Sequence, residues 1–307
     1  MSTQQDARYV VITPCRNEES HIGETIRTVV EQSLPPSLWI IVDDGSTDGT
    51  LEILQEAARE HDFIRVVQRS DRGHRSVGSG VVKAFYAGLE DIDLEDFSYL
   101  CKLDGDLELP PLYFERMIAE MESNPRLGNF SGKVYLRLPN GRLVYERMGD
   151  ENAIGAAKFY RRQCFQEIDG FVPHPGWDGI DGHMCRMRGW IARSRNEADL
   201  RIVHRRLMGS SAGSIWAGRK RWGALKWFQG STLYYVLGVF VYRLVERPFV
   251  VGALGILVGY LGAMLRRDPQ FEVPGFRKTL RDFERRSLFQ GKDAAIRSFE
   301  SQADERS

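Results

Sequence analysis

The sequence predicts an α/β protein in which a mainly parallel sheet is flanked by helices and followed by a C-terminal helical appendage. Two observations predict the sheet. Short runs rich in β-branched residues alternate with segments of helical spacing, and these runs are apolar throughout, as expected of strands covered on both faces. A third observation predicts the appendage, because residues 211–267 combine basic residues, tryptophans and two apolar stretches.

The composition is that of a globular protein and excludes a disordered or fibrous chain. Of the 307 residues, 42% are hydrophobic and 27% are charged, and the formal net charge is zero. The charge is uneven, because residues 1–185 carry 19 Lys and Arg against 31 Asp and Glu, whereas residues 186–307 carry 23 against 11. An acidic body repels nucleic acid, and a basic tail beside an apolar stretch suits an anionic lipid surface. We therefore expect a membrane surface as a partner and no nucleic acid.

Predicted strands and helices alternate along the first hundred residues. The four strand-like runs are residues 9–13, 38–42, 64–68 and 99–103. Apolar residues at helical spacing fill the first two intervals: Ile22, Ile26, Val29 and Val30, then Leu51, Leu54 and Ala58. Such intervals are long enough for right-handed crossovers between parallel strands. Open parallel sheets bind ligands at the carboxyl ends of their strands, so the loops after the four runs are the predicted site.

Residues 107–207 change to mixed elements, which we interpret as an acceptor-side extension of a single domain over residues 1–210. Two prolines, Pro110 and Pro111, open the first of these elements. The predicted elements are a helix over 110–122, strands at 129–138 and 158–160, and a helix over 181–190.

Residues 211–267 are predicted to associate with a membrane, and residues 268–307 to form a polar tail. Between 214 and 227, four Lys and Arg are interleaved with three tryptophans, which is typical of a membrane interface. Apolar stretches follow at 228–242 and 248–265. The second has 18 residues without a charge, and as a helix it would be roughly 27 Å long, slightly under the ~30 Å hydrocarbon core. A spanning helix, an interfacial helical hairpin and two core helices of a soluble domain are all open alternatives.

The cysteines and the N-terminal residues favour the cytoplasm. The four cysteines lie far apart without a C-x-x-C pair, as expected of unpaired thiols in a reducing compartment: Cys15, Cys101, Cys164 and Cys185. Residues 1–7 are polar and lack the apolar region of a signal peptide. We therefore expect the protein at the cytoplasmic face of the cell membrane.

Two acidic clusters follow predicted strands. Asp43 and Asp44 begin a glycine-rich turn, where carboxylates accept hydrogen bonds from a base N–H or from ribose hydroxyls. A helix N-cap would need only one such residue, and a calcium-binding EF-hand loop would need Glu where Gln55 stands. Asp104 and Asp106 form a D-x-D pair, which places two carboxylates within reach of one hard divalent ion. Such an ion holds the phosphates of a nucleoside diphosphate.

With the segment Thr13–Glu19 after the first strand, these clusters resemble glycosyltransferase family 2, the inverting nucleotide-sugar transferases of the Rossmann-like GT-A fold. The resemblance covers roughly residues 8–207, and the run V-D-D-G-S-T-D-G-T at 42–50 is its most specific part. It implies a UDP-, GDP- or dTDP-linked sugar as donor and a divalent cation, Mg²⁺ or Mn²⁺. The residues that it implies for donor binding are Thr13, Pro14, Arg16, Asn17, Glu18, Asp43, Asp44, Lys83, Asp104 and Gly105.

The same resemblance implies the metal ligands. These are Asp104 and Asp106, with Asp106 the more direct ligand, and His204 on a closing segment that reaches the metal or the diphosphate. A neutral imidazole can ligate a metal, and Arg205 and Arg206 suit phosphate. A basic surface that binds lipid phosphates is the open alternative for this segment.

An inverting transfer needs a general base that takes the proton of the acceptor hydroxyl. The resemblance implies Asp181 for this role, at the opening of the predicted helix over 181–190. Asp178 is an alternative that shares the task or positions the acceptor. Asp181 could instead be only the N-cap of that helix.

These observations predict an inverting glycosyltransferase that acts on a lipid-linked or saccharide acceptor. The first alternative is a sugar-phosphate nucleotidyltransferase, which would need a glycine-rich loop with a basic residue after its first strand. The segment Thr13–Glu19 contains no glycine. The second alternative is a non-catalytic membrane-associated adaptor that binds nucleotide, in which loss of Asp181 would have no consequence.

Overall fold

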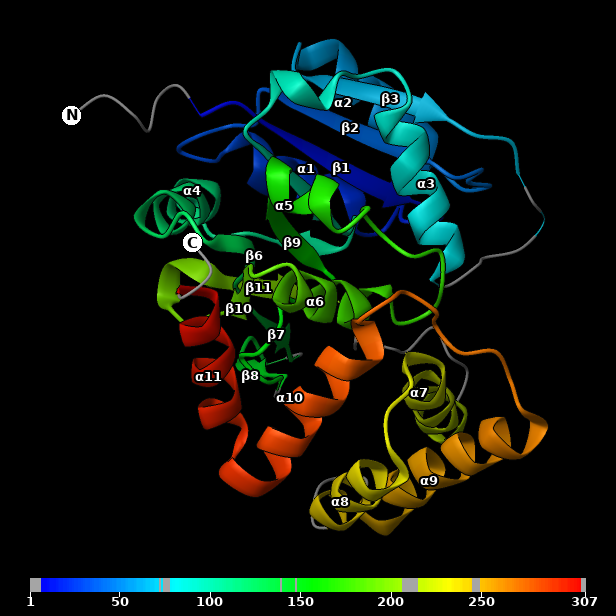
Figure 1. Cartoon of the computed structure of the whole chain (residues 1–307). Coiled ribbons are helices and arrows are strands. Elements are labelled where there is room, and N and C mark those ends of the chain that lie inside the picture. Colours follow the sequence, from blue (N-terminus) through cyan, green and yellow to red (C-terminus); the bar gives the residue numbers. More distant parts are fainter. Residues whose placement is uncertain are drawn as a thin grey trace. The chain divides into compact units, whose positions relative to one another are not determined.

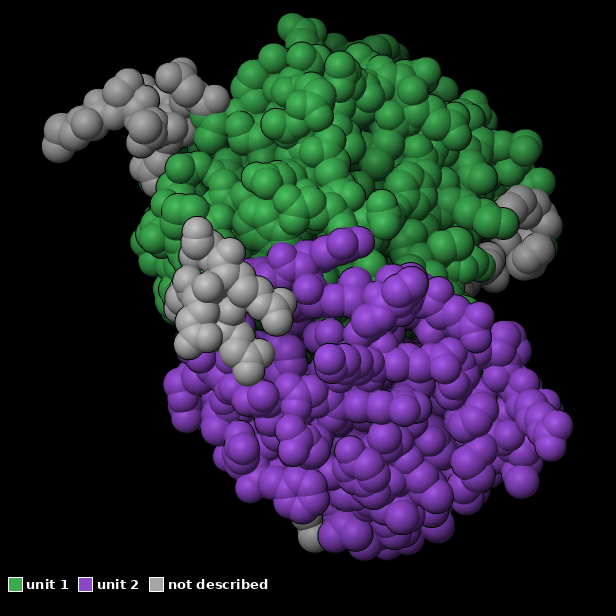
Figure 2. Space-filling view, viewed as in Figure 1, with its two compact units in different colours: residues 1–185, 190–207 green, residues 186–189, 208–307 purple. Residues whose placement is uncertain are grey.

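The computed structural model describes residues 7–71, 73, 78–138, 140–146, 148–205, 215–244 and 249–304. The chain divides into two compact units, shown in different colours in Figure 2. The first unit comprises residues 1–185 and 190–207, and the second comprises residues 186–189 and 208–307.

A seven-stranded sheet forms the centre of the first unit, in the order β10-β6-β9-β4-β1-β2-β3 (Figure 1). Its strands are β1 Tyr9–Cys15, β2 Leu38–Asp43, β3 Ile64–Gln68, β4 Tyr99–Leu103, β6 Leu127–Ser131, β9 Ala157–Arg161 and β10 Ile191–Ser194. The first four strands pair in parallel, whereas β9 runs antiparallel to both of its neighbours. The predicted fold class, a mainly parallel sheet flanked by helices, is therefore confirmed.

Helices cover this sheet, and a smaller sheet adjoins it. The helices are α1 Ile22–Val30, α2 Thr50–Glu60, α3 Ser79–Leu89, α4 Tyr113–Ser123, α5 Arg162–Glu167 and α6 Trp177–Met187, with short 3-10 turns η1 Leu94–Asp96 and η2 Ala198–Leu200. The four-stranded sheet has the order β5-β11-β7-β8. Its strands are β5 Leu107–Glu108, β7 Lys133–Arg137, β8 Leu143–Tyr145 and β11 Arg201–His204.

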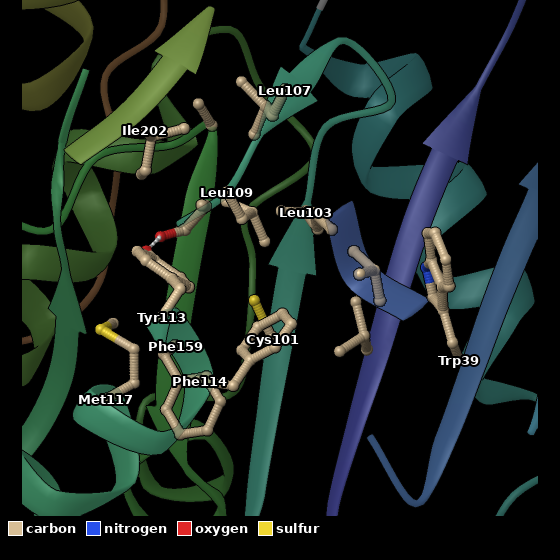
Figure 3. Close-up of a cluster of buried hydrophobic side chains, with 14 of the residues drawn as sticks. Trp39, Cys101, Leu103, Leu107, Leu109, Tyr113, Phe114, Met117, Phe159 and Ile202 are labelled. Atoms are coloured by element: carbon tan, nitrogen blue, oxygen red, sulfur yellow. Dashed lines mark hydrogen bonds between the residues drawn. The ribbon is translucent and has the colours of Figure 1, made fainter. Parts of the chain in front are cut away.

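A continuous apolar core lies between the large sheet and its covering helices (Figure 3). Phe114 of α4 and Phe159 of β9 are fully buried in it, with ring centroids 6.3 Å apart. Burial of aromatic side chains dominates the stabilisation of such a core. The core holds the strands rigidly, so the loops at their carboxyl ends have a fixed frame.

The predicted strand over 129–138 is in fact two strands, β6 and β7, that belong to different sheets. The break lies at Gly132, where an added Cβ would come within 1.7 Å of the Leu200 carbonyl oxygen. Only glycine allows the chain to pass so close to another backbone while it changes sheets.

The helix predicted over 181–190 also differs, because α6 begins four residues earlier, at Trp177, and ends at Met187. Asp181 therefore lies in the second turn and is not the N-cap. Gly189 has φ +87° and follows the helix end, a conformation that terminates helices. The residues at the opening of the helix are Trp177 and Asp178.

The second unit is helical. Its helices are α7 Ile215–Gln229, α8 Leu233–Arg243, α9 Phe249–Arg266, α10 Phe276–Gln290 and α11 Lys292–Asp304. Among the described residues, α9 alone is long and apolar enough to cross a membrane, with 18 residues and a mean hydropathy of 1.8. The predicted polar tail contains α10 and α11, and α10 buries Phe276, Leu280 and Phe283.

Candidate active site

The loops that follow β1 and β2 are joined by hydrogen bonds at the carboxyl edge of the large sheet. Arg16 donates from Nη1 to the Asp44 carbonyl oxygen at 2.6 Å. The Asn17 backbone N–H donates to Ser46 Oγ at 3.0 Å, and Asn17 Oδ1 accepts from the Thr47 N–H at 2.8 Å. Three of the residues predicted to bind the donor, Arg16, Asn17 and Asp44, therefore form one connected loop pair.

Asp43 and Asp44 have different surroundings. Asp43 is buried, and its carboxylate accepts the Ser46 N–H at 3.2 Å, which shapes the turn. The Asp44 carboxylate accepts from Arg69 Nη1 at 2.6 Å. Arg69 was missed in the sequence, although it directly follows β3 at the same edge of the sheet. Gly45 has φ +75°, and an added Cβ there would lie 2.5 Å from Asp71 Cα.

Other residues predicted in the first loop support it from inside. Thr13 is fully buried, and its hydroxyl oxygen accepts from Trp39 Nε1 at 2.9 Å. Glu18 is buried, and its backbone N–H donates to Thr50 Oγ1 at 2.8 Å. Pro14 is half-buried within β1. Thr13 and Glu18 therefore hold the loop in position.

The D-x-D loop lies beside the end of β1. An added Cβ on Gly105 would lie 3.2 Å from Ile22 Cδ1 and in van der Waals contact with Cys15 Sγ at 3.5 Å, so a side chain there would press on Ile22. The Asp104 carboxyl is 32% exposed and pairs with Lys102 Nζ, which also donates to the Gly155 carbonyl oxygen at 2.7 Å. Lys102 was not predicted, although a charged residue inside an otherwise apolar strand was a visible signal.

Asp106 and His204 meet although 98 residues separate them in the sequence. His204 Nε2 lies 3.0 Å from Asp106 Oδ2, and both side chains are buried. Burial lowers the pKa of His204, but the hydrogen bond and the charge of Asp106 outweigh it, and the net pKa is above its usual value. Beside this pair, Arg205 Nη1 donates to Glu108 Oε1 at 2.8 Å. The structure thus joins the predicted closing segment to the D-x-D loop.

These residues fit a divalent cation that is shared with a substrate. Within the described ranges, no group of three or more His, Cys, Asp or Glu side chains is arranged as a complete protein cage. Mg²⁺ and Mn²⁺ prefer carboxylate oxygens, and Mg²⁺ usually binds one or two carboxylates together with phosphates and water. Asp104 and Asp106 supply such carboxylates, and the His204 ring lies beside Asp106.

Asp181, predicted as the general base, is enclosed in an ion pair. It is 2% exposed, and its Oδ1 and Oδ2 lie 2.7 and 2.5 Å from Lys158 Nζ. The Tyr160 hydroxyl also donates to it, and the Gly182 N–H donates at 2.6 Å. Burial raises the pKa of Asp181 against the opposing effect of Lys158. Both oxygens are occupied, so this carboxylate does not face an acceptor in the structure.

Asp178 is half-buried and lies in the first turn of α6. Its Oδ2 is 2.9 Å from the position of an added Cβ on Gly155, the residue whose carbonyl oxygen accepts from Lys102. Trp177 precedes it, with the ammonium groups of Lys102 and Lys158 5.4 and 5.2 Å from its ring centroid. Asp178 therefore lies beside Gly155, whose carbonyl oxygen binds the lysine that pairs with Asp104.

Lys83 is a predicted donor-binding residue that no described hydrogen bond or ion pair connects to this cluster. Its side chain is exposed on α3. Residues 74–77 begin the segment 74–83, for which the family resemblance implies contact with the diphosphate-sugar, and they lie outside the described residues, as does Arg206.

Known proteins resemble this chain in sequence and in structure. A poly-beta-1,6-N-acetyl-D-glucosamine synthase of Staphylococcus epidermidis is 31% identical over 127 residues, which are 40% of this chain and 27% of the synthase. The chain therefore aligns with about a quarter of that relative's length.

Two solved structures share the fold. One is the mannosyltransferase PcManGT of Pyrobaculum calidifontis in complex with GDP-Man and Mn²⁺, with a TM-score of 0.53, 16% identity and coverage of 97% of this chain and 86% of that one. The other is residues 1–349 of S. aureus TarS with UDP-GlcNAc, with a TM-score of 0.52, 16% identity and coverage of 97% and 92%. Residues 10–176 match the family described as Glycosyl transferase family 2. Because this match covers more than half of the sequence, the chain belongs to glycosyltransferase family 2.

Proposed function

We propose that the protein transfers a sugar from a nucleoside-diphosphate sugar to an acceptor hydroxyl, with inversion at the anomeric carbon. The observation that carries this proposal is the convergence of Asp44, Asp106 and His204 at the carboxyl edge of β1, β2 and β4. The loops after β1 and β2 would hold the nucleoside, and the D-x-D loop the diphosphate. A divalent cation bound there would neutralise the charge that develops on the leaving diphosphate.

In this proposal Asp178 is the general base and Asp181 is a supporting residue. Asp178 would take the proton from the acceptor hydroxyl as the oxygen attacks the anomeric carbon opposite the leaving group. A general base must reach that proton, and Asp178 is the less enclosed of the two acids. Asp181 would hold Lys158 and with it the start of α6.

The acceptor and the location are also proposals. The S. epidermidis relative is named for a polysaccharide, which favours a saccharide or a lipid-linked saccharide as acceptor. The apolar and basic helices of the second unit favour attachment to a membrane, and the buried unpaired cysteines suit its cytoplasmic face.

The test is release of nucleoside diphosphate from a panel of UDP-, GDP- and dTDP-sugars with Mn²⁺, with lipid extracts and oligosaccharides as acceptors. Release with at least one donor is expected, and chelation of the metal should stop it. Asp106→Asn should lower the rate about a hundredfold or more, because it removes a metal-binding carboxylate. The matched control is Asp62→Asn, an exposed acid after α2, which should leave the rate unchanged. Absence of release with every donor and acceptor would refute the proposed enzyme.

A further inference from the structure

Helices α7 and α9 of the second unit pack at backbone distance. An added Cβ on Gly259 would lie 2.0 Å from the Lys220 carbonyl oxygen, and one on Gly255 would lie 2.7 Å from Arg219 Cβ. Gly223 belongs to α7, and an added Cβ there would lie 1.9 Å from the Ile256 carbonyl oxygen of α9. The middle of α9 is therefore fixed against Arg219 and Lys220 of α7.

A different side of α9 is exposed and apolar, and α8, which packs against α9, also carries exposed apolar residues (Figure 1). On α9 the exposed residues are Phe249, Val250, Val251, Leu254, Val258 and Leu265, and on α8 they are Leu233, Tyr234, Leu237, Val241 and Tyr242. Fifteen of the eighteen exposed large hydrophobic residues of the described chain lie in this unit. An exposed apolar surface of this extent marks an interaction site.

Helix α7 carries the charge complementary to anionic lipid headgroups. Arg219, Lys220 and Arg221 are consecutive in the sequence. The exposed ring of Trp222 is contacted by the guanidinium groups of Arg219 and Arg243, 4.4 and 5.6 Å from its centroid. Tryptophan and basic residues are typical of protein segments that lie at the headgroup level of a bilayer.

These contacts disfavour a transmembrane orientation of α9. Gly255 and Gly259 occupy the middle of the 18-residue helix, so a spanning α9 would carry Arg219 and Lys220 to the bilayer midplane. Charged residues are unfavourable there, and the headgroups would be about 15 Å away on either side. Helix α8 has 11 residues and is roughly 16 Å long, too short to cross.

We propose that α8 and α9 lie in the plane of the membrane, with their exposed apolar residues among the acyl chains of one leaflet. The basic residues of α7 contact the headgroups of anionic lipids in the same leaflet. This inference rests on the proposed membrane attachment and specifies its geometry.

The first experiment measures depth in vesicles of equal parts phosphatidylglycerol and phosphatidylcholine. Val251→Cys, Val258→Cys and Leu265→Cys each receive a fluorophore, which is quenched by lipids with nitroxides at known depths. The native cysteines are buried. From Val251 to Leu265 the helix rises roughly 21 Å. We expect one common depth for the three labels. Val258 lying deeper than both Val251 and Leu265 by about half of this rise would overturn the proposal, because a spanning helix places its middle at the centre of the bilayer.

The second experiment measures vesicle binding by sedimentation. Val251→Asp combined with Val258→Asp should weaken binding more than tenfold. The control is Leu143→Asp combined with Val144→Asp on β8, which are 38% and 37% exposed and belong to the first unit. This control should bind like the native protein. Lys220→Gln combined with Arg221→Gln should reduce the preference for phosphatidylglycerol by roughly fivefold per charge.

Native protein that fails to bind vesicles yet transfers sugar to a soluble acceptor would refute the attachment and leave the transferase proposal standing. A dimer in solution that Val251→Asp and Val258→Asp dissociate, with vesicle binding unchanged, would assign the apolar surface to a second copy and overturn the inference. Binding with a spanning α9 would overturn the in-plane geometry alone.

Discussion

At the residue scale, Asp178 and Asp181 show how two acids of one helix acquire different chemistry. Asp181 is enclosed by Lys158 and Tyr160 from β9, whereas Asp178 is half-buried beside Gly155. A buried ion pair that loses one partner leaves an uncompensated charge, which is costly. The two residues should therefore respond differently to substitution.

Asp178→Asn is expected to lower turnover by about a hundredfold or more without loss of stability, as for removal of a general base. Asp181→Ala is expected to lower the free energy of unfolding by about 3–5 kcal/mol, because Lys158 stays buried and unpaired. Turnover and denaturant unfolding measure the two effects. An Asp181→Asn protein with native stability and no turnover would return the role of base to Asp181.

The buried carboxyl of Glu284 predicts a pH dependence of the stability of the second unit. The carboxyl is 1% exposed, and its Oε1 accepts from Ser231 Oγ at 2.6 Å and lies 3.9 Å from Lys226 Nζ. Burial raises its pKa more than Lys226 and these hydrogen bonds lower it. Because the folded pKa is raised, its contribution to stability is complete below the unfolded pKa of about 4.3 and is lost as the pH rises through the folded value.

Glu284→Gln should therefore remove the decline in stability that begins as the pH rises above the unfolded pKa of about 4.3, and it should be more stable than the native protein at alkaline pH. Denaturant unfolding across this range measures it. Glu272→Gln is the control, because that side chain is 81% exposed. If the stability of the native protein and of Glu284→Gln depends on pH in the same way, folding does not raise the pKa of the Glu284 carboxyl.

At the scale of elements, two glycines of α9 distinguish the effect of helix packing on stability from the effect of helix propensity. Replacing glycine by alanine inside a helix favours the helix by about 1 kcal/mol. At Gly262 the nearest atom to an added Cβ is Arg266 Nη1 at 3.3 Å, the end of a flexible side chain, whereas at Gly259 it is backbone at 2.0 Å.

Gly262→Ala should thus be neutral or stabilising, and Gly259→Ala should destabilise the protein by forcing α7 and α9 apart. Thermal unfolding in a mild detergent measures both. Equal effects at the two positions would contradict the close packing of α7 on α9.

At the scale of the whole molecule, acidic and basic residues are segregated along the chain. Residues 186–307, which carry 23 Lys and Arg against 11 Asp and Glu, include the whole second unit and residues 190–207 of the first. Attraction to anionic lipids should therefore come from that part of the chain.

A protein that ends at Leu207 should stay in the supernatant when sedimented with anionic vesicles, whereas the full chain should sediment with them. High salt should weaken the sedimentation of the full chain, because screening reduces its attraction to the headgroups. Sedimentation of both proteins to the same extent would place the lipid-binding surface in the first unit.

The sequence by itself determined the parallel sheet and the edge at which the acidic clusters lie. The strands can be recognised from short stretches of sequence. Because parallel strands end at the same edge of a sheet, their order in the chain also predicts where the loops that follow them lie. It also separated Asp43 and Asp44 from Asp104 and Asp106 as two clusters.

The tertiary structure alone decided which of these groups meet and which are enclosed. It paired Asp106 with His204 and Asp44 with Arg69, buried Asp181 against Lys158, and left Asp178 half-buried. It also showed that α9 packs against the basic helix α7, a contact that the hydropathy of the sequence does not predict. The physical reason is that burial and pairing depend on residues far apart in the chain, and the desolvation of a charge is known only when its neighbours are known.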